Sequence, residues 1–438
     1  MRARACILLG SLLLLACSLG AEPVGVTVNG EGVSAGYGAG WVYVEPMLTL
    51  AGPGPFVLSG ESTNGSVRVS VNASATVVLS NLVLCATMDD ACAFSLMPNV
   101  SATVSLAGTN VLASGGLRAG LETTGASATI TAVPGARAAY LEACGGELGA
   151  GIGSANGKRN GAVRICGGEI VAAGGTGAAG IGGGGYGGEG GMVQITGGHV
   201  TAKGGLFGAG IGGGALGAGG SVTVSGGTVR AIAGPGMSVA YSSAPSGMDV
   251  GGGTYGRAGE VAITGGSLSA STFFAEPSNG VERVYCVTVP GLPPDAEVSV
   301  SGLGGYGVAD IRADESGNAY LWLPSAEKVH GFTAGGFSYS AMVAGADAVA
   351  EKGTVVGGFS LSGLSWTSLD MEEGTLAFAA TLEGEGPDVL TLVYRTALGS
   401  SAQKAPGCDV EWSAGGGALT LPAGWDDGVG FFAIGLEW

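Results

Sequence analysis

The chain has 438 residues, of which 90 are glycine and 46% are apolar, and it carries a formal net charge of −17 with only 12% charged residues. The apolar fraction is large enough to build a buried core, which excludes a disordered protein, and glycine does not recur at every third position, which excludes collagen. No basic stripe is present to neutralise phosphates, so the sequence also excludes a nucleic-acid partner.

Residues 1–21 have the three parts of an export signal. Arg2 lies in a short basic segment, residues 5–16 form a largely apolar run, and small residues follow. The run is too short to span a bilayer, and no later segment reaches about 18 uninterrupted apolar residues, so we expect no membrane span. Residues 14–17 also resemble a bacterial lipoprotein cleavage box, which keeps open a lipid anchor at Cys17. Both alternatives predict a secreted or bacterial cell-surface protein.

Six cysteines remain after the signal, in a compartment where disulfides persist. Cys85 and Cys92 close a short loop and are the first candidates for a disulfide, and Cys144 and Cys166 are the next. No two cysteines have the paired spacing that is typical of a zinc site. The cysteines are therefore predicted to be structural, and no metal site is predicted.

Upstream of residue 132, short apolar strands alternate with polar turns. The strands at 77–79 and 104–106 are 27 residues apart, and Asn81 and Asn110 lie in the turns that follow them. We expect these asparagines to add side-chain hydrogen bonds to bends of the backbone. Residues 25–58 precede this segment and are expected to cap it, because repeat folds need a capped end.

A glycine-rich repeat is the strongest signal in the chain. The runs GAGI, GAAGI and GAGI end at Ile152, Ile181 and Ile211, so they are 29 and 30 residues apart. Each run leads into a glycine loop, a short alternating strand, a double glycine and another strand. A fourth copy of the strand and double glycine follows an insertion that we expect within residues 235–250.

Strands this short lack the helical period and cannot build a long-stranded sandwich. They can stack as turns of a right-handed parallel β-helix, with neighbouring strands about 4.8 Å apart. The predicted inward ladders are Val163, Val193 and Val222, and Ile165, Ile195 and Val224. Each double glycine is expected to mark a tight bend, where positive φ or close backbone approach excludes a side chain. The first glycines of these pairs, Gly167, Gly197 and Gly226, are expected to adopt equivalent backbone conformations.

The loops after the isoleucine runs are the predicted binding region, because loops on a rigid scaffold carry function. Tyrosine rings offer flat faces to sugars, and basic residues can meet uronate carboxylates by charge-assisted hydrogen bonds. The candidate binding residues are Lys158, Arg159, Tyr186, Tyr255 and Arg257. The alternative is that they are ordinary solvated loop residues.

Several runs resemble a known family. They are FVLSGESTNGSVRV from Phe56, TVVLSNLVL from Thr76, CAFSL from Cys92, VSLAGTNVLASGG from Val104, and the GAGIG-type loops with their double-glycine turns. Over residues 56–270 the chain resembles secreted bacterial glycine-rich right-handed parallel β-helix proteins labelled carbohydrate-binding domain-containing, which are shaped like pectate lyases. The resemblance implies binding of plant-type or acidic polysaccharides, often with calcium. The chain departs from this pattern because Asp249 is its one aspartate between residues 100 and 275.

Catalysis on this fold needs clustered charged groups. A hydrolase needs paired carboxylates, and a lyase needs several carboxylates around calcium beside a basic residue. Glu169, Glu189 and Glu260 occupy positions in the repeat that do not match. We therefore predict no catalytic residue and no release of reducing ends or unsaturated uronates, with a polysaccharide lyase-like enzyme as the alternative.

After residue 275 the glycine repeat stops and longer strands begin. They predict a small antiparallel β domain at 276–345, a linker at 346–358 and a β-sandwich-like module at 359–438. The coil with its N-terminal cap occupies 22–275. The predicted fold class is therefore all-β, a right-handed parallel β-helix followed by two small antiparallel β modules.

The sequence favours a non-catalytic protein that binds a polysaccharide or cell-surface glycan and needs no cofactor of its own. The alternative is a structural or adhesive envelope protein that contacts protein partners. Deleting the segment after Ala275 distinguishes the two, because glycan binding by the coil survives that deletion.

Overall fold

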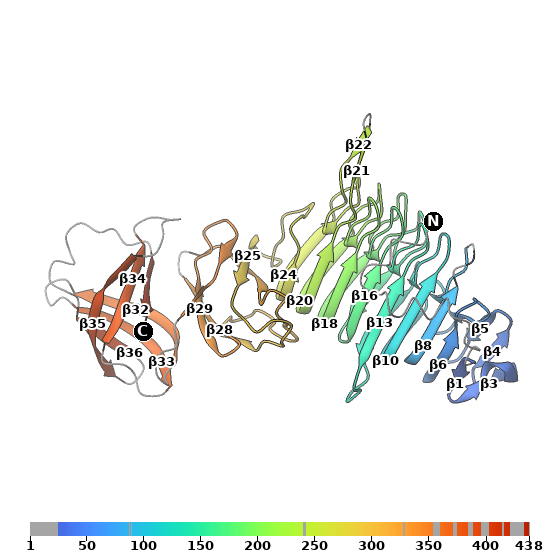
Figure 1. Cartoon of the computed structure of the whole chain (residues 1–438), viewed down its shortest axis with the longest axis horizontal. Coiled ribbons are helices and arrows are strands. Elements are labelled where there is room, and N and C mark those ends of the chain that lie inside the picture. Colours follow the sequence, from blue (N-terminus) through green and yellow to red (C-terminus); the bar gives the residue numbers. More distant parts are fainter. Residues whose placement is uncertain are drawn as a thin grey trace. The chain divides into compact units, whose positions relative to one another are not determined.

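The computed structural model describes residues 25–86, 88, 90–239, 242–326, 329–353, 360–370, 375–383, 389–395, 403–413, 416–420 and 433–437. The predicted signal at 1–21 and the alternative lipid anchor at Cys17 lie outside these residues. The chain divides into two compact units, Met1–Gly280 and Val281–Trp438. Regular structure in the described ranges is strand except for one 3₁₀ turn, Val33–Ala35, so the predicted all-β class is confirmed (Figure 1). Among the same residues, no helix is long and apolar enough to cross a membrane.

The first sheet of unit 1 has ten strands in the order β23-β19-β17-β14-β11-β9-β7-β5-β4-β3. They are β3 (Tyr37–Gly38), β4 (Trp41–Val44), β5 (Met47–Leu50), β7 (Arg68–Val71), β9 (Phe94–Leu96), β11 (Leu121–Glu122), β14 (Ile152–Gly153), β17 (Ile181–Gly182), β19 (Ile211–Gly212) and β23 (Val250–Gly251). From β5 to β23 the pairing is parallel, and Ile152, Ile181 and Ile211 lie in register and are buried. The antiparallel strands β3, β4 and β5 end the sheet.

The second sheet of unit 1 has twelve strands. They are β1 (Thr27–Val28), β2 (Glu31–Gly32), β6 (Phe56–Ser62), β8 (Ala75–Ala86), β10 (Ser101–Ser114), β12 (Ser127–Ala132), β13 (Ala139–Cys144), β15 (Ala162–Ile165), β16 (Glu169–Ala173), β18 (Met192–Lys203), β20 (Ser221–Ile232) and β24 (Glu260–Ser269). Its core is formed by buried ladders in parallel register. These ladders contain Val163, Val193 and Val222, and Ile165, Ile195 and Val224, which confirms both predicted ladders.

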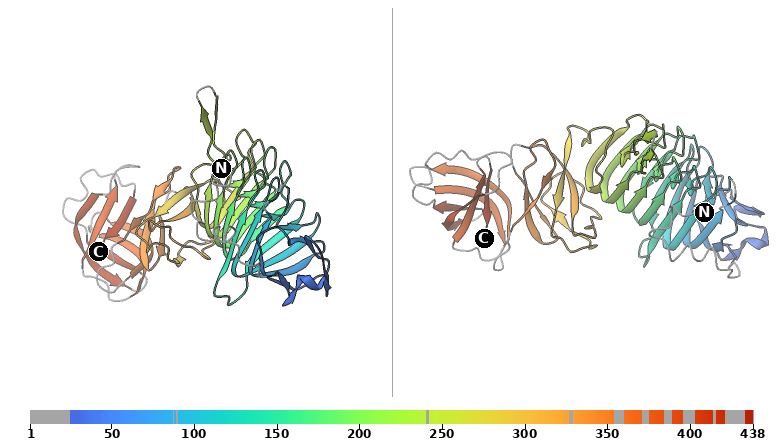
Figure 2. Two further views of the ribbon diagram at one scale, coloured as in Figure 1. Left: turned by 45° about the vertical axis from the view of Figure 1, so that its right-hand side comes forward. Right: turned by 45° about the horizontal axis from the view of Figure 1, so that its top comes forward.

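Consecutive turns of the chain lie side by side in unit 1 (Figures 1 and 2). The long strands β10 and β18 pass through a bend and pair on both sides of it. As a result the six strands β12, β15, β18, β16, β13 and β10 form a closed ring of parallel pairings. Each turn also contributes a short strand to the ten-stranded sheet, so the loops between the two sheets recur at a regular spacing.

The bend within each turn lies at the second glycine of the pair. The second glycines are Gly168, Gly198, Gly227 and Gly266, with φ of 97°, 85°, 85° and 79°. The double glycine therefore marks the bend, as predicted, and the positive φ lies at its second residue, because the first glycines, Gly167, Gly197 and Gly226, are not among the residues with positive φ. A Cβ on Gly198 would lie 2.6 Å from the carbonyl oxygen of Gly168, so the neighbouring backbone also excludes a side chain there.

Asparagine supports the bends farther upstream. Asn81 has a φ of 54°, and its Oδ1 accepts a hydrogen bond from the Thr109 amide at 3.2 Å. Asn110 is fully buried, accepts from the Leu82 amide at 3.0 Å and donates from Nδ2 to two carbonyl oxygens. The predicted side-chain hydrogen bonds at these bends are therefore confirmed.

The insertion between β20 and β23 is a β-hairpin. Its strands, β21 (Met237–Val239) and β22 (Ser242–Ala244), pair antiparallel, and they project away from the stacked turns in Figure 1. The hairpin lies within residues 235–250, where the sequence predicted the insertion.

Neither predicted disulfide is formed, because Cys92 and Cys166 are thiols in the structure. Cys85 lies on β8 of the twelve-stranded sheet, whereas Cys92 precedes β9 of the ten-stranded sheet, so their short spacing does not pair them. Burial raises the pKa of Cys92 to about 12, which makes this thiol unreactive. The Cys144 sulfur donates to Glu142 Oε1 at 3.7 Å instead of joining Cys166.

Unit 2 contains three sheets within the described residues. The first is β25 (Val284–Val289), β27 (Ala319–Pro324) and β30 (Ala348–Val349), and the second is β26 (Val300–Ser301), β28 (His330–Ala334), β29 (Phe337–Ala341) and β31 (Glu351–Lys352). The third is antiparallel and consists of β32 (Ser360–Asp370), β33 (Thr375–Glu383), β34 (Val389–Arg395), β35 (Gln403–Ser413), β36 (Gly416–Thr420) and β37 (Ala433–Glu437). β30 and β31 fall in the predicted linker at 346–358, of which residues 354–358 lie outside the described part. Val287, Leu321 and Phe332 pack in one core of the first two sheets.

Candidate functional site

Four glycine-rich loops connect the ten-stranded sheet to the following strand of the twelve-stranded sheet. They span residues 154–161, 183–191, 213–220 and 252–259, and we call their row the loop edge. Backbone hydrogen bonds hold the loops in register, from Asn160 N to Glu189 O at 2.9 Å, from Gly190 N to Ala218 O at 2.9 Å and from Gly219 N to Arg257 O at 3.1 Å. Arg159, Glu189, Ala218 and Arg257 therefore occupy equivalent positions in four consecutive turns.

The charged side chains of the loop edge project from a fixed backbone. Ser154 Oγ donates to the Lys158 carbonyl at 2.7 Å and accepts from the Gly184 amide at 2.9 Å, which ties the first loop to the second. Arg159 Nε lies 3.6 Å from Glu189 Oε2, with 72% and 51% of the two side chains exposed. Exposed ion pairs of this kind contribute little to stability, so Arg159 remains available to a ligand.

Large apolar side chains are exposed on the same loops. The exposed fractions are 53% for Tyr186, 57% for Leu216 and 66% for Tyr255. Leu216 and Tyr255 have φ of 64° and 57°, whereas Gly187 occupies the corresponding bend of the second loop with a φ of 83°. A left-handed conformation costs a residue with a side chain about 1–3 kcal/mol, and such strain gathers at ligand sites. At position 255 the chain thus has an exposed tyrosine ring, although glycine would adopt the same backbone conformation without strain.

The loop edge brings all five predicted binding residues onto one side of unit 1. Lys158 and Arg159 lie in the first loop, Tyr186 in the second, and Tyr255 and Arg257 in the fourth. Four loops separated by strand spacings form a row about 14 Å long. The row has rings and cations but one carboxylate, Glu189, which lies beside Arg159, so it lacks the pair of carboxyl groups that a glycosidase requires.

Sequence reasoning missed a second group of polar residues, on the outward side of the strands that follow the bends. Glu169 lies beside His199 in register and diagonally from Glu142 on the neighbouring strand. Burial raises the pKa of Tyr140 to about 12, and the negative charges of Glu142 and Glu169 add to that effect. Burial also raises the pKa of Glu142, opposed by the Cys144 thiol and by Lys203. In the sequence this group can be recognised because its members occupy alternate positions of a strand and recur with the 30-residue period.

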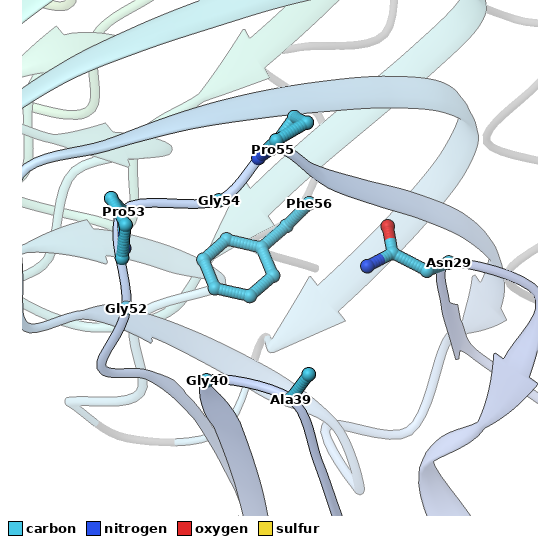
Figure 3. A pocket seen from close by; sticks show the side chains of 8 residues that line it. All are labelled: Asn29, Ala39, Gly40, Gly52, Pro53, Gly54, Pro55 and Phe56. Atoms are coloured by element: carbon cyan, nitrogen blue, oxygen red, sulfur yellow. The ribbon is translucent and has the colours of Figure 1, made fainter.

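A small pocket lies in the N-terminal strands of unit 1 (Figure 3). It has a volume of about 300 Å³ and is lined by Asn29, Ala39, Gly40, Gly52, Pro53, Gly54, Pro55 and Phe56. The Asn29 side chain points toward it and accepts a hydrogen bond from the Val57 amide at 2.7 Å. No acidic or basic side chain lines this pocket, so it offers no acid–base chemistry.

Glu122 has a structural role. Arg118 binds it in bidentate geometry, with Nε at 2.7 Å from Oε2 and the second contact at 2.9 Å, and Glu122 is buried. Within the ranges that the structure describes, no group of three or more histidine, cysteine, aspartate or glutamate residues is placed to hold a metal ion.

No protein family, curated protein or solved structure matches this chain in sequence and fold comparisons.

Proposed function

We propose that this chain is a non-catalytic polysaccharide-binding protein, secreted or held on the bacterial surface, and that it binds glycan along the loop edge. One observation carries the proposal: Tyr186 and Tyr255 are exposed on the same edge as Arg159 and Arg257. Aromatic rings give flat apolar faces that pack on sugar rings, and guanidinium groups donate paired hydrogen bonds to carboxylates.

We propose further that the stacked turns of unit 1 form a right-handed parallel β-helix. Parallel, in-register pairing between strands about one repeat apart supports this architecture, and connections between parallel strands are right-handed in nearly all proteins. A scaffold that repeats one loop at a constant spacing suits a polymeric ligand, because successive sugar units meet equivalent positions. The resemblance to secreted carbohydrate-binding β-helix proteins and the export signal at 1–21, with a lipid anchor at Cys17 as the alternative, support the same function and location.

The charges of the loop edge favour glycans that carry carboxylates. Lys158, Arg159 and Arg257 are exposed cations on a chain whose formal net charge is −17, so positive charge is concentrated locally at this edge. Binding of a uronate-containing polysaccharide is therefore expected to weaken as salt screens these charges. The single carboxylate of the edge supports binding without cleavage, and we propose no resident calcium.

A pair of tyrosine variants tests the proposal. Tyr186→Ala and Tyr255→Gly together remove both rings, and glycine at 255 relieves the left-handed strain, so the fold is expected to remain at least as stable. We expect binding to a polysaccharide identified on a glycan array to weaken about tenfold, which corresponds to about 1.4 kcal/mol. Tyr37→Ala is the matched control, because Tyr37 is 77% exposed on β3, away from the loop edge.

The proposal predicts unchanged glycan binding for Tyr37→Ala and a thermal unfolding midpoint for the double variant that is no lower than that of the parent. Equal binding by the double variant and the parent would overturn it, as would an equal loss in the Tyr37→Ala control. Release of reducing ends or unsaturated uronates from pectin, alginate or xylan would show that the protein is an enzyme.

A further inference from the structure

The strands that follow the bends present a continuous outward surface on unit 1. β13, β16, the second half of β18 and the second half of β20 pair in parallel register and lie side by side in Figure 1. Along each strand buried residues alternate with accessible ones, as where buried Ile170 separates Glu169 from Val171. We call the accessible residues of these four strands the outer face.

Two rows of residues cross the outer face from strand to strand. One row is Glu142, Val171, Thr201 and Arg230, and the other is Tyr140, Glu169, His199 and Thr228. The carboxylates lie on β13 and β16, and the cations Lys203 and Arg230 lie on β18 and β20. With histidine neutral, the formal charges of the outer face cancel, although the whole chain carries −17.

Acidic and basic residues lie on opposite sides of the middle of the outer face, so its two halves are complementary in charge. A two-fold axis parallel to the strands, midway between β16 and β18, exchanges β13 with β20 and β16 with β18. When a second copy faces the first across this axis, Glu142 meets Arg230 of the second copy and Glu169 meets His199 of the second copy. Each contact then occurs twice, as an isologous interface requires.

We infer that the outer face is the interface of a homodimer in which two copies of unit 1 pack face to face with their coil axes antiparallel. Charge complementarity identifies the partner as a second copy, because an unrelated partner would not need acidic and basic residues placed symmetrically about one line. The burial of Glu142 agrees with a second copy as the partner. Its carboxylate is half-buried, and a guanidinium opposite it would offset the cost of that burial.

The size of the outer face sets the expected strength of the dimer. Four strands cover only about 15 Å along the coil, and Val111 on β10 and Ser269 on β24 extend the first row by one position at each end. The resulting area is smaller than the roughly 800 Å² per partner of a standard interface. We therefore expect a reversible dimer with a micromolar dissociation constant.

Variants of the full chain in which these charges are reversed, and a mixture of such variants, test this inference. Glu142→Arg or Arg230→Glu alone places like charges opposite each other twice. Each variant is therefore expected to be monomeric at concentrations at which the parent dimerises. Sedimentation equilibrium over a range of concentrations measures this difference. An equimolar mixture of the two variants restores both opposite-charge contacts and is expected to dimerise. The chain that carries both substitutions is expected to dimerise for the same reason. Arg159→Glu, on the loop edge, is the matched control and leaves the dimer unchanged.

Three results would overturn the homodimer: a parent that stays monomeric at hundreds of micromolar, single variants that dimerise like the parent, or a mixture of folded variants that stays monomeric. Circular dichroism establishes that the variants are folded. If Glu142→Arg does not fold, Glu142→Gln replaces it and is expected to weaken the dimer severalfold, with an unchanged dimer as the contrary result. The glycan experiment is independent, because none of these interface substitutions alters the loop edge.

Discussion

At the residue scale, Asp249 shows how a buried carboxylate serves the fold instead of chemistry. Its Oδ1 accepts from the Ala233 amide at 2.7 Å, and its Oδ2 accepts from the Ser271 amide at 2.8 Å, the Ser271 hydroxyl at 2.9 Å and the Thr272 amide at 3.0 Å. Asp249 thereby joins the end of β20, the base of the hairpin and the segment after β24. Three backbone amides and one hydroxyl therefore engage its carboxylate oxygens.

We predict that Asp249→Asn destabilises unit 1 by about 1–3 kcal/mol, because in either orientation of the new side chain its amide nitrogen faces at least one backbone amide that donates to Asp249. Glu260→Gln is the matched control, since Glu260 is exposed at the start of β24 and is expected to change stability by less than about 0.5 kcal/mol. Urea unfolding of both variants measures the difference. Equal effects of the two substitutions would contradict the structural role of Asp249.

The pH dependence of the same residue gives a second measurement. Burial alone would raise the pKa of Asp249, but the hydrogen bonds from Ser271, Ala233 and Thr272 outweigh it and lower the pKa below 3.8. A carboxylate with a lowered folded-state pKa contributes stability above its unfolded pKa and loses it as pH falls through the folded value. The stability difference between parent and Asp249→Asn is therefore expected to be constant near neutral pH and to shrink below about pH 4.

At the element scale, the bend after each first strand depends on one glycine of the pair. Gly168 has a φ of 97° and a Cβ there would lie 3.0 Å from the Ala139 carbonyl oxygen, whereas a Cβ on Gly167 would meet nothing closer than 3.6 Å. We predict that Gly168→Ala destabilises the protein by about 1–3 kcal/mol. Gly167→Ala is its matched control and is expected to be nearly neutral or slightly stabilising. Guanidinium unfolding curves compare the two, and a larger loss at Gly167 would contradict the observed bend.

The same elements show what a sequence can predict here and what it cannot. The ladder of Val163, Val193 and Val222 was predictable, because alternation and the repeat length together determine the register. The bend at each double glycine was predictable too, but not which of its two glycines has the positive φ, because only the backbone geometry distinguishes them. The proposed disulfide between Cys85 and Cys92 was wrong, because closeness along the chain does not say which sheet each cysteine joins.

The candidate site was predictable to a similar degree. The five loop-edge residues follow repeated runs, so their common edge could be inferred from the period alone. The outer face was missed, because it depends on the register of the second strand in each turn, which is offset from the loops. The structure aligns Glu142, Val171, Thr201 and Arg230 in one row, at intervals of 29, 30 and 29 residues, but which strand positions face outward depends on where each bend falls.

At the scale of the whole molecule, the end of unit 1 determines where the chain can be truncated. Residues after β24 complete the last turn, since Phe273 bridges to Val250 and Ser278 bridges to Ala262. The Ile263 amide donates to the Ser278 carbonyl at 2.7 Å, and the Ser278 amide donates to the Val261 carbonyl at 3.1 Å. These bonds cover a strand edge that would otherwise be open to aggregation, and unit 1 extends to Gly280.

We therefore predict that a chain ending at Gly280 folds, binds glycan through the loop edge and dimerises through the outer face. A chain ending at Ala275 lacks both Ser278 hydrogen bonds and is expected to be about 2 kcal/mol less stable and more prone to aggregate, because each bond contributes about 1 kcal/mol. Urea midpoints and light scattering compare the two truncated chains. Equal stability would show that the Ser278 bridge does not cap the last turn, and loss of glycan binding in the longer chain would assign binding to unit 2. Comparison of the two truncated chains thus separates the effect of residues 276–280, which cap the last turn, from the effect of the C-terminal sheets.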